Sequence, residues 1–155
     1  MDKRFLNYIE LLDPLFQQLM RMEPVKVDAL PSNVPAKGVY LFSEGSKHLY
    51  VGRSRRMRAR LQRHSRPGAR HSSASLAFAL ARKSTGKHKA TYQTSKSRRT
   101  LENEAGFREA FARAKQRIRR MDIRFVGEGD PTRQALLEMY VAIALGTPHN
   151  DFDTH

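Results

Sequence analysis

Residues 38–52 read GVYLFSEGSKHLYVG, and this stretch contains the most specific pattern in the chain. Residues 39–42 and 49–51 are β-branched, aromatic or aliphatic, and such residues favour strands. The Glu-Gly-Ser between them favours a turn. The stretch therefore predicts a β-hairpin. Tyr40 and Tyr50 are ten residues apart in it and can share one face if the strand register permits.

An arginine-rich helix is predicted directly after the hairpin, over residues 55–64. Met57 and Leu61 lie four residues apart and provide its apolar anchors. Arg60 lies ten positions after the second tyrosine. His64 falls on the same face as Arg60, because residues four apart are neighbours on a helix. A basic helix face in contact with solvent is the plain alternative for both side chains.

The residues before the hairpin predict helical structure followed by a linker. Apolar residues at steps of four and three indicate helix over residues 3–22. The Asp13-Pro14 pair interrupts this pattern, so the segment forms either two short helices or one kinked helix. It either packs on the core or mediates dimerisation. Residues 23–37 contain three prolines and predict an extended linker.

The residues after residue 65 predict two further helices, a strand and a final helix. The first two helices are expected over residues 76–81 and 102–120, with a basic loop over residues 86–99 between them. A strand is expected over residues 122–126. The final helix has clear ends, because Asp130-Pro131 suits a helix start and Gly146 with Pro148 suits a helix stop.

The positive charge is concentrated in one part of the chain. The 155 residues include 29 Lys+Arg and 15 Asp+Glu, a formal net charge of +14. The 57 residues from 45 to 101 contain 16 Lys+Arg and no carboxylate. A basic segment of this kind on a nearly neutral body indicates an anionic polymer as partner.

Composition excludes several classes of protein. The chain has no cysteine, which rules out disulfides, Cys-based zinc sites and thiol catalysis. No apolar run approaches the roughly 18 residues needed to cross a bilayer. The N-terminus leads into an amphipathic pattern and not into a signal-peptide core, so a cytoplasmic location without membrane contact is expected.

The hairpin and the helix after it resemble the GIY-YIG nuclease family, named for a Gly-Ile-Tyr strand paired with a Tyr-Ile-Gly strand. Here Gly38-Val-Tyr40 and Tyr50-Val-Gly52 carry Val in place of both Ile residues. The resemblance covers residues 38–152 with an unmatched middle. It implies an α/β (α+β) domain with a small, mainly antiparallel three-stranded sheet flanked by helices.

The resemblance also implies a domain organisation. Residues 1–36 form an N-terminal helical extension and linker. Residues 37–155 form the nuclease-like domain, with a basic insertion at about residues 65–118.

The resemblance implies a catalytic set that uses a divalent cation, Mg²⁺ or Mn²⁺. Its residues are Tyr40, Tyr50, Arg60, His64, Glu138 and Asn150. Tyr40 or His64 removes the proton of the attacking water, Arg60 contacts the scissile phosphate, Glu138 holds the metal and Asn150 buttresses the site.

The residues around Glu138 leave two explanations open for its carboxylate. Glu138 shares an apolar helix face with Val141, Ala142 and Leu145. A carboxylate buried there needs a partner. That partner is either an arginine or a hard divalent cation, and Mg²⁺ suits one carboxylate combined with waters and a substrate phosphate.

The function implied by the resemblance is metal-dependent hydrolysis of phosphodiester bonds by a DNA endonuclease acting on double-stranded DNA. The residues expected to contact nucleic acid are Arg53, Arg55, Arg56, Arg63, Arg66, Arg70, Lys87 and Lys89. A binding module for DNA or RNA that keeps the fold without catalysis is the alternative, and charge alone also permits a ribosome-associated protein. A homodimer is expected if the DNA target is two-fold symmetric.

Overall fold

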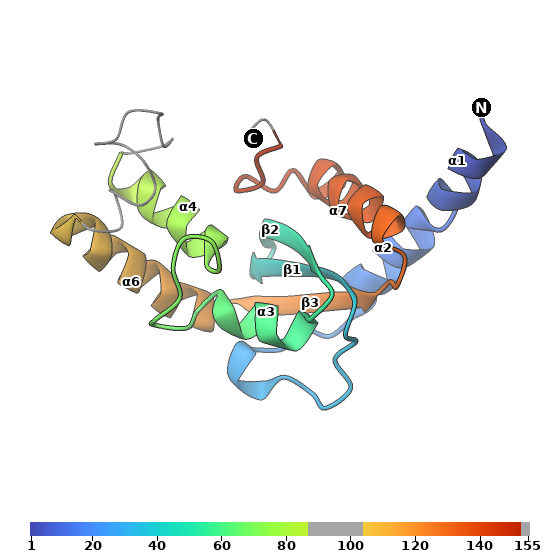
Figure 1. Cartoon of the computed structure of the whole chain (residues 1–155). Helices are drawn as coiled ribbons and strands as arrows, with labels where there is room; N and C mark the ends of the chain where they lie inside the picture. The colour runs from blue at the N-terminus through green and yellow to red at the C-terminus, as the bar shows by residue number, and fades with distance from the viewer. Residues whose placement is uncertain (87–103, 153–155) are drawn as a thin grey trace. The chain divides into compact units, whose positions relative to one another are not determined.

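The computed structural model describes residues 1–86 and 104–152 (Figure 1). The chain is α+β and divides into two compact units, Met1–Ala59 with Met121–His155, and Arg60–Arg120. The second unit contains the segment 65–118 that the sequence predicts as an insertion. Each unit is described by itself below.

A three-stranded antiparallel sheet forms the centre of the first unit, in the order β2-β1-β3 (Figure 1). The strands are β1 (Gly38–Glu44), β2 (Lys47–Ser54) and β3 (Asp122–Gly127). The predicted hairpin is confirmed, and its turn includes Gly45 at a φ of +60°, which glycine adopts without steric cost. Because β1 lies between β2 and β3, β2 is an edge strand, and it begins immediately after the turn.

The strand register assigns side chains to the two faces of the sheet. Tyr40 lies opposite Gly52 and Phe42 opposite Tyr50, whereas Val39 lies opposite Arg53. Directly opposed residues share a face, and successive residues alternate between faces. The tyrosines of both motifs therefore lie on one face of the sheet and Arg53 lies on the other.

Helices of the first unit cover the face that carries Val39 and Arg53. These helices are α2 (Leu12–Arg21) and α7 (Pro131–Leu145), and α1 (Lys3–Ile9) packs against both of them. The core residues on this side of the sheet and on α2 and α7 are Leu12, Leu19, Val39, Leu41, Val51, Val126, Leu137, Val141 and Ala142. The N-terminal helices thus share one hydrophobic core with the sheet.

The ends of these helices follow local capping rules. The sequence predicted an interruption at Asp13-Pro14, but the two N-terminal helices separate earlier, at Glu10-Leu11, and Pro14 lies in the first turn of α2. Proline is tolerated there because the first turn has no intrahelical acceptors for its N–H groups. The predicted ends of α7 are confirmed. Asp130 Oδ1 accepts a hydrogen bond from the Arg133 N–H at 2.9 Å, and Gly146 has a φ of +62°.

The predicted extended linker contains one short helical turn, Val27–Ala29, and one bridge to the sheet. Val25 pairs with Ile123 through two backbone hydrogen bonds of 2.8 and 2.9 Å. The linker therefore adds a single bridge to the free edge of β3.

The second unit is built on two helices, α4 (Ser75–Ser84) and α6 (Ala105–Arg119). They pack through a cluster of aromatic rings, with Phe78 5.0 Å from Phe107 and 5.8 Å from Phe111 between ring centroids. The two helices confirm those predicted over residues 76–81 and 102–120. Except for Gly86, the predicted loop over residues 86–99 lies outside the described residues. Helix α3 (Met57–Arg63) begins in the first unit and ends in the second.

Candidate active site

Both motif glycines lie where a larger side chain would not fit. A Cβ atom on Gly38 would fall on the backbone carbonyl of Val126, and one on Gly52 would fall on the Tyr40 hydroxyl, each well inside van der Waals contact. The absence of a side chain at Gly52 lets the Tyr40 ring lie across β2. The Tyr40 ring is buried, and its hydroxyl therefore reaches the edge strand.

The two tyrosines form one aromatic group. Their ring centroids are 6.4 Å apart, and the Phe42 ring lies 5.7 Å from that of Tyr40. Tyr50 is more accessible than Tyr40, because it lies on the edge strand and is only partly buried. The predicted meeting of Tyr40 and Tyr50 on one face is confirmed.

Glu138 on α7 forms an ion pair with Arg53 on β2. Arg53 Nε lies 3.6 Å from Glu138 Oε1, and the two side chains are 47% and 19% exposed. Burial raises the pKa of the Glu138 carboxyl, and the Arg53 guanidinium opposes this shift. Of the two explanations that the sequence left open, the structure shows the arginine partner, and this partner is a residue assigned above only to nucleic-acid contact.

Asn150 is bound to the free edge of β2. Its Oδ1 accepts from the Val51 N–H at 2.9 Å, and its Nδ2 donates to the Val51 carbonyl at 2.8 Å. The Thr147 hydroxyl donates to the same Oδ1 at 2.7 Å and so fixes the orientation of the amide. The side-chain amide thus pairs with β2 as a neighbouring strand would and positions the backbone between Tyr50 and Gly52.

We predict that Asn150→Ala lowers the free energy of unfolding by about 2 kcal/mol, because both backbone groups of Val51 lose their partner at a partly buried site. Urea denaturation of the purified variant measures this change. Asn33→Ala, at an exposed position in the linker, is the control and should leave the midpoint unchanged. Equal midpoints for the two variants would contradict the anchoring role.

The edge strand β2 borders both groups of side chains. Tyr40 and Tyr50 lie on one face of the sheet, the Arg53–Glu138 pair lies on the other, and Asn150 binds the edge between them. The four predicted catalytic residues of the first unit therefore gather around β2. The sheet separates the tyrosines from the carboxylate.

Arg60 belongs to the second unit and is held by the loop before α4. Its Nη1 donates to the carbonyls of Ser72 at 3.4 Å and Ser73 at 3.2 Å, and its Nη2 donates to Ser75 Oγ at 3.5 Å. These contacts orient the planar guanidinium, which has five N–H donors in all. Arg60 is therefore a positioned side chain and not a member of a freely solvated face.

His64, also in the second unit, is completely buried. Burial lowers the pKa of its imidazole to about 3, and the positive charge of Arg60 adds to this shift. The imidazole is consequently neutral at physiological pH. The alternative explanation of His64 as a surface residue on a basic helix is wrong, because His64 directly follows the end of α3 and its side chain is completely buried.

The depressed pKa of His64 predicts a specific pH dependence of stability. Its ordinary pKa is 6.5 and its folded-state pKa is about 3. Between these values the unfolded chain binds a proton that the folded chain does not, so stability falls as the pH decreases. The slope approaches about 1.4 kcal/mol per pH unit for this one group.

Proton NMR of the imidazole C–H groups tests the prediction directly. The His64 resonances should keep their positions between pH 8 and pH 5. A titration midpoint near the ordinary value of 6.5 would show that solvent reaches the ring.

The entire net charge of the protein belongs to the second unit. Residues 60–120 contain 17 Lys+Arg and 3 acidic residues, whereas the first unit contains 12 of each kind. The predicted contact residues Arg53, Arg55, Arg56, Arg63, Arg66 and Arg70 are all exposed. Lys87 and Lys89 lie outside the described residues. A polyanion would therefore be attracted to the second unit.

Sequence reasoning missed several residues that matter here. Thr147, which orients Asn150, was signalled only by its spacing of three residues from that asparagine. Lys115 is buried beside Phe111, although a lysine within the apolar stripe of residues 107–118 was a visible anomaly. Arg108 is an exposed residue of the same helix.

Within residues 1–86 and 104–152 no three His, Cys, Asp or Glu side chains come together as a metal site. A divalent cation at Glu138 would thus have at most two such ligands from the described part of the chain. Mg²⁺ is commonly held by one or two carboxylates with waters and substrate phosphates, so the donor set fits that ion. In the same ranges no helix is long and apolar enough to cross a membrane.

Comparisons of the chain with protein-family models, with curated proteins and with solved structures find no match.

Proposed function

We propose that the protein is a metal-dependent DNA endonuclease of the GIY-YIG type. The observation that carries the proposal is the pairing of Gly38-Val-Tyr40 with Tyr50-Val-Gly52, in which Gly52 makes room for the Tyr40 hydroxyl. The Tyr40 ring requires a glycine at position 52 for steric reasons. The proposal adds that the hydroxyl placed there has a task at the edge of the sheet.

The side chains support the individual roles. Tyr40 places its phenol oxygen at the edge strand, where its deprotonated form, the phenolate, can accept the proton of an attacking water. A phenol needs nearby positive charge for that role, because its ordinary pKa is about 10. Arg60 is held by its loop contacts, and a planar guanidinium can bridge two phosphate oxygens and stabilise the charge that develops on them.

Glu138 would hold Mg²⁺ or Mn²⁺, and the cation would supply charge neutralisation at the leaving oxygen. Burial raises the pKa of the Glu138 carboxyl, and the positive charge of Arg53 opposes this shift and so favours the ionised form. Asn150 secures the backbone of β2 between Tyr50 and Arg53.

A binding module without catalysis is the second candidate, and two observations favour it. The sheet separates the Glu138 carboxylate from Tyr40 and Tyr50, which the nuclease would need at one phosphate. The Glu138 carboxylate already has an arginine partner, which satisfies its charge without a metal. The basic second unit serves a binding module as well as it serves a nuclease.

Incubation of the purified protein with supercoiled plasmid separates the two candidates. The nuclease proposal expects nicked and linear products with Mg²⁺ or Mn²⁺, and none with EDTA. Tight binding without cleavage under either metal would refute the nuclease and favour the binding module.

A further inference from the structure

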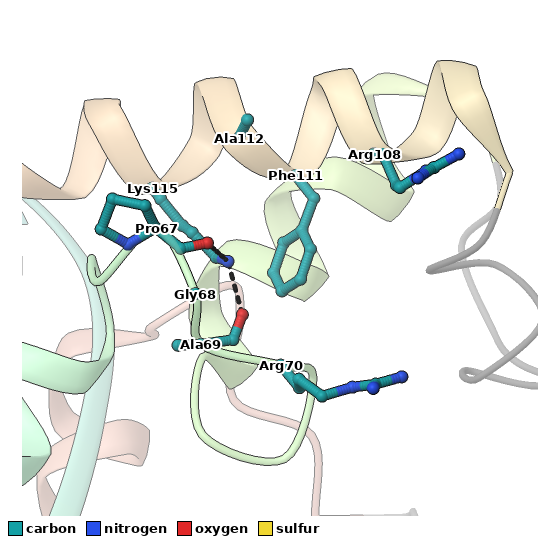
Figure 2. Close-up of a pocket in the computed structure, with 8 residues that line it drawn as sticks. All are labelled: Pro67, Gly68, Ala69, Arg70, Arg108, Phe111, Ala112 and Lys115. Atoms are coloured by element: carbon teal, nitrogen blue, oxygen red, sulfur yellow. Dashed lines mark hydrogen bonds between the residues drawn. The ribbon is translucent and has the colours of Figure 1, made fainter.

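The second unit contains a pocket of about 370 Å³ between α6 and the loop of residues 67–70 (Figure 2). The loop forms one wall with Pro67, Gly68, Ala69 and Arg70. Helix α6 forms the other wall with Arg108, Phe111, Ala112 and Lys115. Figure 2 shows the Phe111 ring between the walls, with Arg70 and Arg108 extending from opposite walls toward the same side.

Lys115 fixes the shape of the pocket. Its ammonium group donates to the carbonyls of Pro67, at 2.9 Å, and Ala69, and lies 4.1 Å from the centroid of the Phe111 ring. A buried ammonium is costly unless such partners compensate for lost hydration. Lys115 therefore ties the loop to α6 and holds Arg70 opposite Arg108.

The charge of the pocket is of one sign. Its eight described lining residues include three cations and no carboxylate. Arg70 and Arg108 are exposed, so their guanidinium groups are accessible to a ligand. A planar guanidinium can donate two parallel hydrogen bonds to two oxygens of one phosphate. The two arginines therefore suit a phosphate ligand.

We propose that this pocket binds one backbone phosphate of duplex DNA, with Arg70 and Arg108 as its ligands and Lys115 as a positioning residue. This inference deepens the proposed function and rests on it for the identity of the polymer. The site lies wholly in the second unit, which carries the net charge of +14. The net charge attracts DNA to the unit as a whole, and the pocket would hold one phosphate at a defined position.

Fluorescence anisotropy with a labelled duplex of about 30 base pairs tests the proposal, in EDTA so that no cleavage occurs. Arg108→Ala should weaken binding about tenfold, the loss typical of a charge-assisted hydrogen bond. It should also lower the slope of log K against log salt by up to about 0.9, because one fewer cation neutralises the DNA backbone. Arg70→Ala should give a similar loss from the opposite wall.

Arg113→Ala is the matched control, because it removes the same charge from an exposed position of α6 outside the pocket. Its expected effect is less than about twofold. Circular dichroism should show equal melting for both α6 variants. Equal losses of affinity for Arg108→Ala and Arg113→Ala would overturn the phosphate-binding role of the pocket. Only attraction by the net charge of the unit would then remain.

Two further outcomes separate this inference from the nuclease proposal. If the wild type binds DNA with the expected Arg108 dependence but never cleaves it, only the nuclease proposal fails. If the wild type cleaves DNA while Arg108→Ala binds normally, only the pocket fails. Tighter binding of duplex RNA with the same Arg108 dependence would overturn the assignment to DNA.

Discussion

Glu138→Gln should abolish plasmid nicking while leaving DNA binding and stability intact. The glutamine keeps the shape of the side chain but cannot supply a charged ligand to a divalent cation. We expect a loss of at least about 100-fold in rate, as when one electrostatic group is removed from a transition state. Duplex binding should be unaffected, because the net charge lies in the second unit.

The pKa of Glu138 predicts that the variant folds normally. Burial raises this pKa above its ordinary value, so the folded chain holds a proton more readily than the unfolded chain does. The carboxyl therefore contributes less to stability as the pH rises through the shifted pKa. A neutral glutamine avoids that loss, and the melting temperature at pH 7 should not fall.

An acidic residue on the protein surface provides the control for this experiment. Glu109→Gln removes one negative charge from the exposed face of α6, where the side chain is 76% exposed. Its nicking rate should equal that of the wild type. Full activity of Glu138→Gln would exclude Glu138 as a metal ligand, and activity that is equal in every variant would indicate a contaminating nuclease.

Gly52→Ala should strongly destabilise the protein. The new Cβ would overlap the hydroxyl and ring of Tyr40, which is buried and packs against Phe42 and Tyr50. Overpacking of this kind costs about 3 kcal/mol. Since small domains are marginally stable, we expect a decrease in melting temperature of roughly 10 °C.

Gly129→Ala is the matched control, because a Cβ there meets no atom within 4 Å. It should melt within about 2 °C of the wild type. A double-mutant cycle with Tyr40→Leu identifies the cause. The shorter side chain removes the overlapping atoms, so the double variant should lose less stability than the sum of the single variants. Additive losses, or equal melting of Gly52→Ala and Gly129→Ala, would contradict the steric role of Gly52.

Local patterns in the sequence predicted the secondary structure of the described residues well. The hairpin, the strand before α7 and the ends of α7 follow from turn chemistry, β-propensity and capping residues that lie close together in the chain. The N-terminal break was misplaced by a few residues. Asp13-Pro14 carries both a helix-start and a helix-break signal, and proline in a first turn does not end a helix.

The sequence predicted only part of the arrangement of the candidate site residues. The spacing of the two motifs correctly placed Tyr40 and Tyr50 on one face. The partner of Glu138 is Arg53, 85 positions away, because the α7 helix packs on the face of the sheet where Arg53 emerges. The burial of His64 likewise depends on packing that a helical pattern does not specify.

The sequence by itself determined that a tyrosine-bearing hairpin exists and that a basic segment accompanies it. Only the tertiary structure decided which residues that basic segment comprises. Charge counting along the chain marked residues 45–101, whereas packing gathers the whole net charge into residues 60–120 and brings Arg108 to Arg70 across a pocket. The physical reason is the separation along the chain over which each kind of interaction acts. Turns, caps and strand propensities act between neighbouring residues, whereas ion pairs, burial and pockets depend on segments that meet only after the chain has folded.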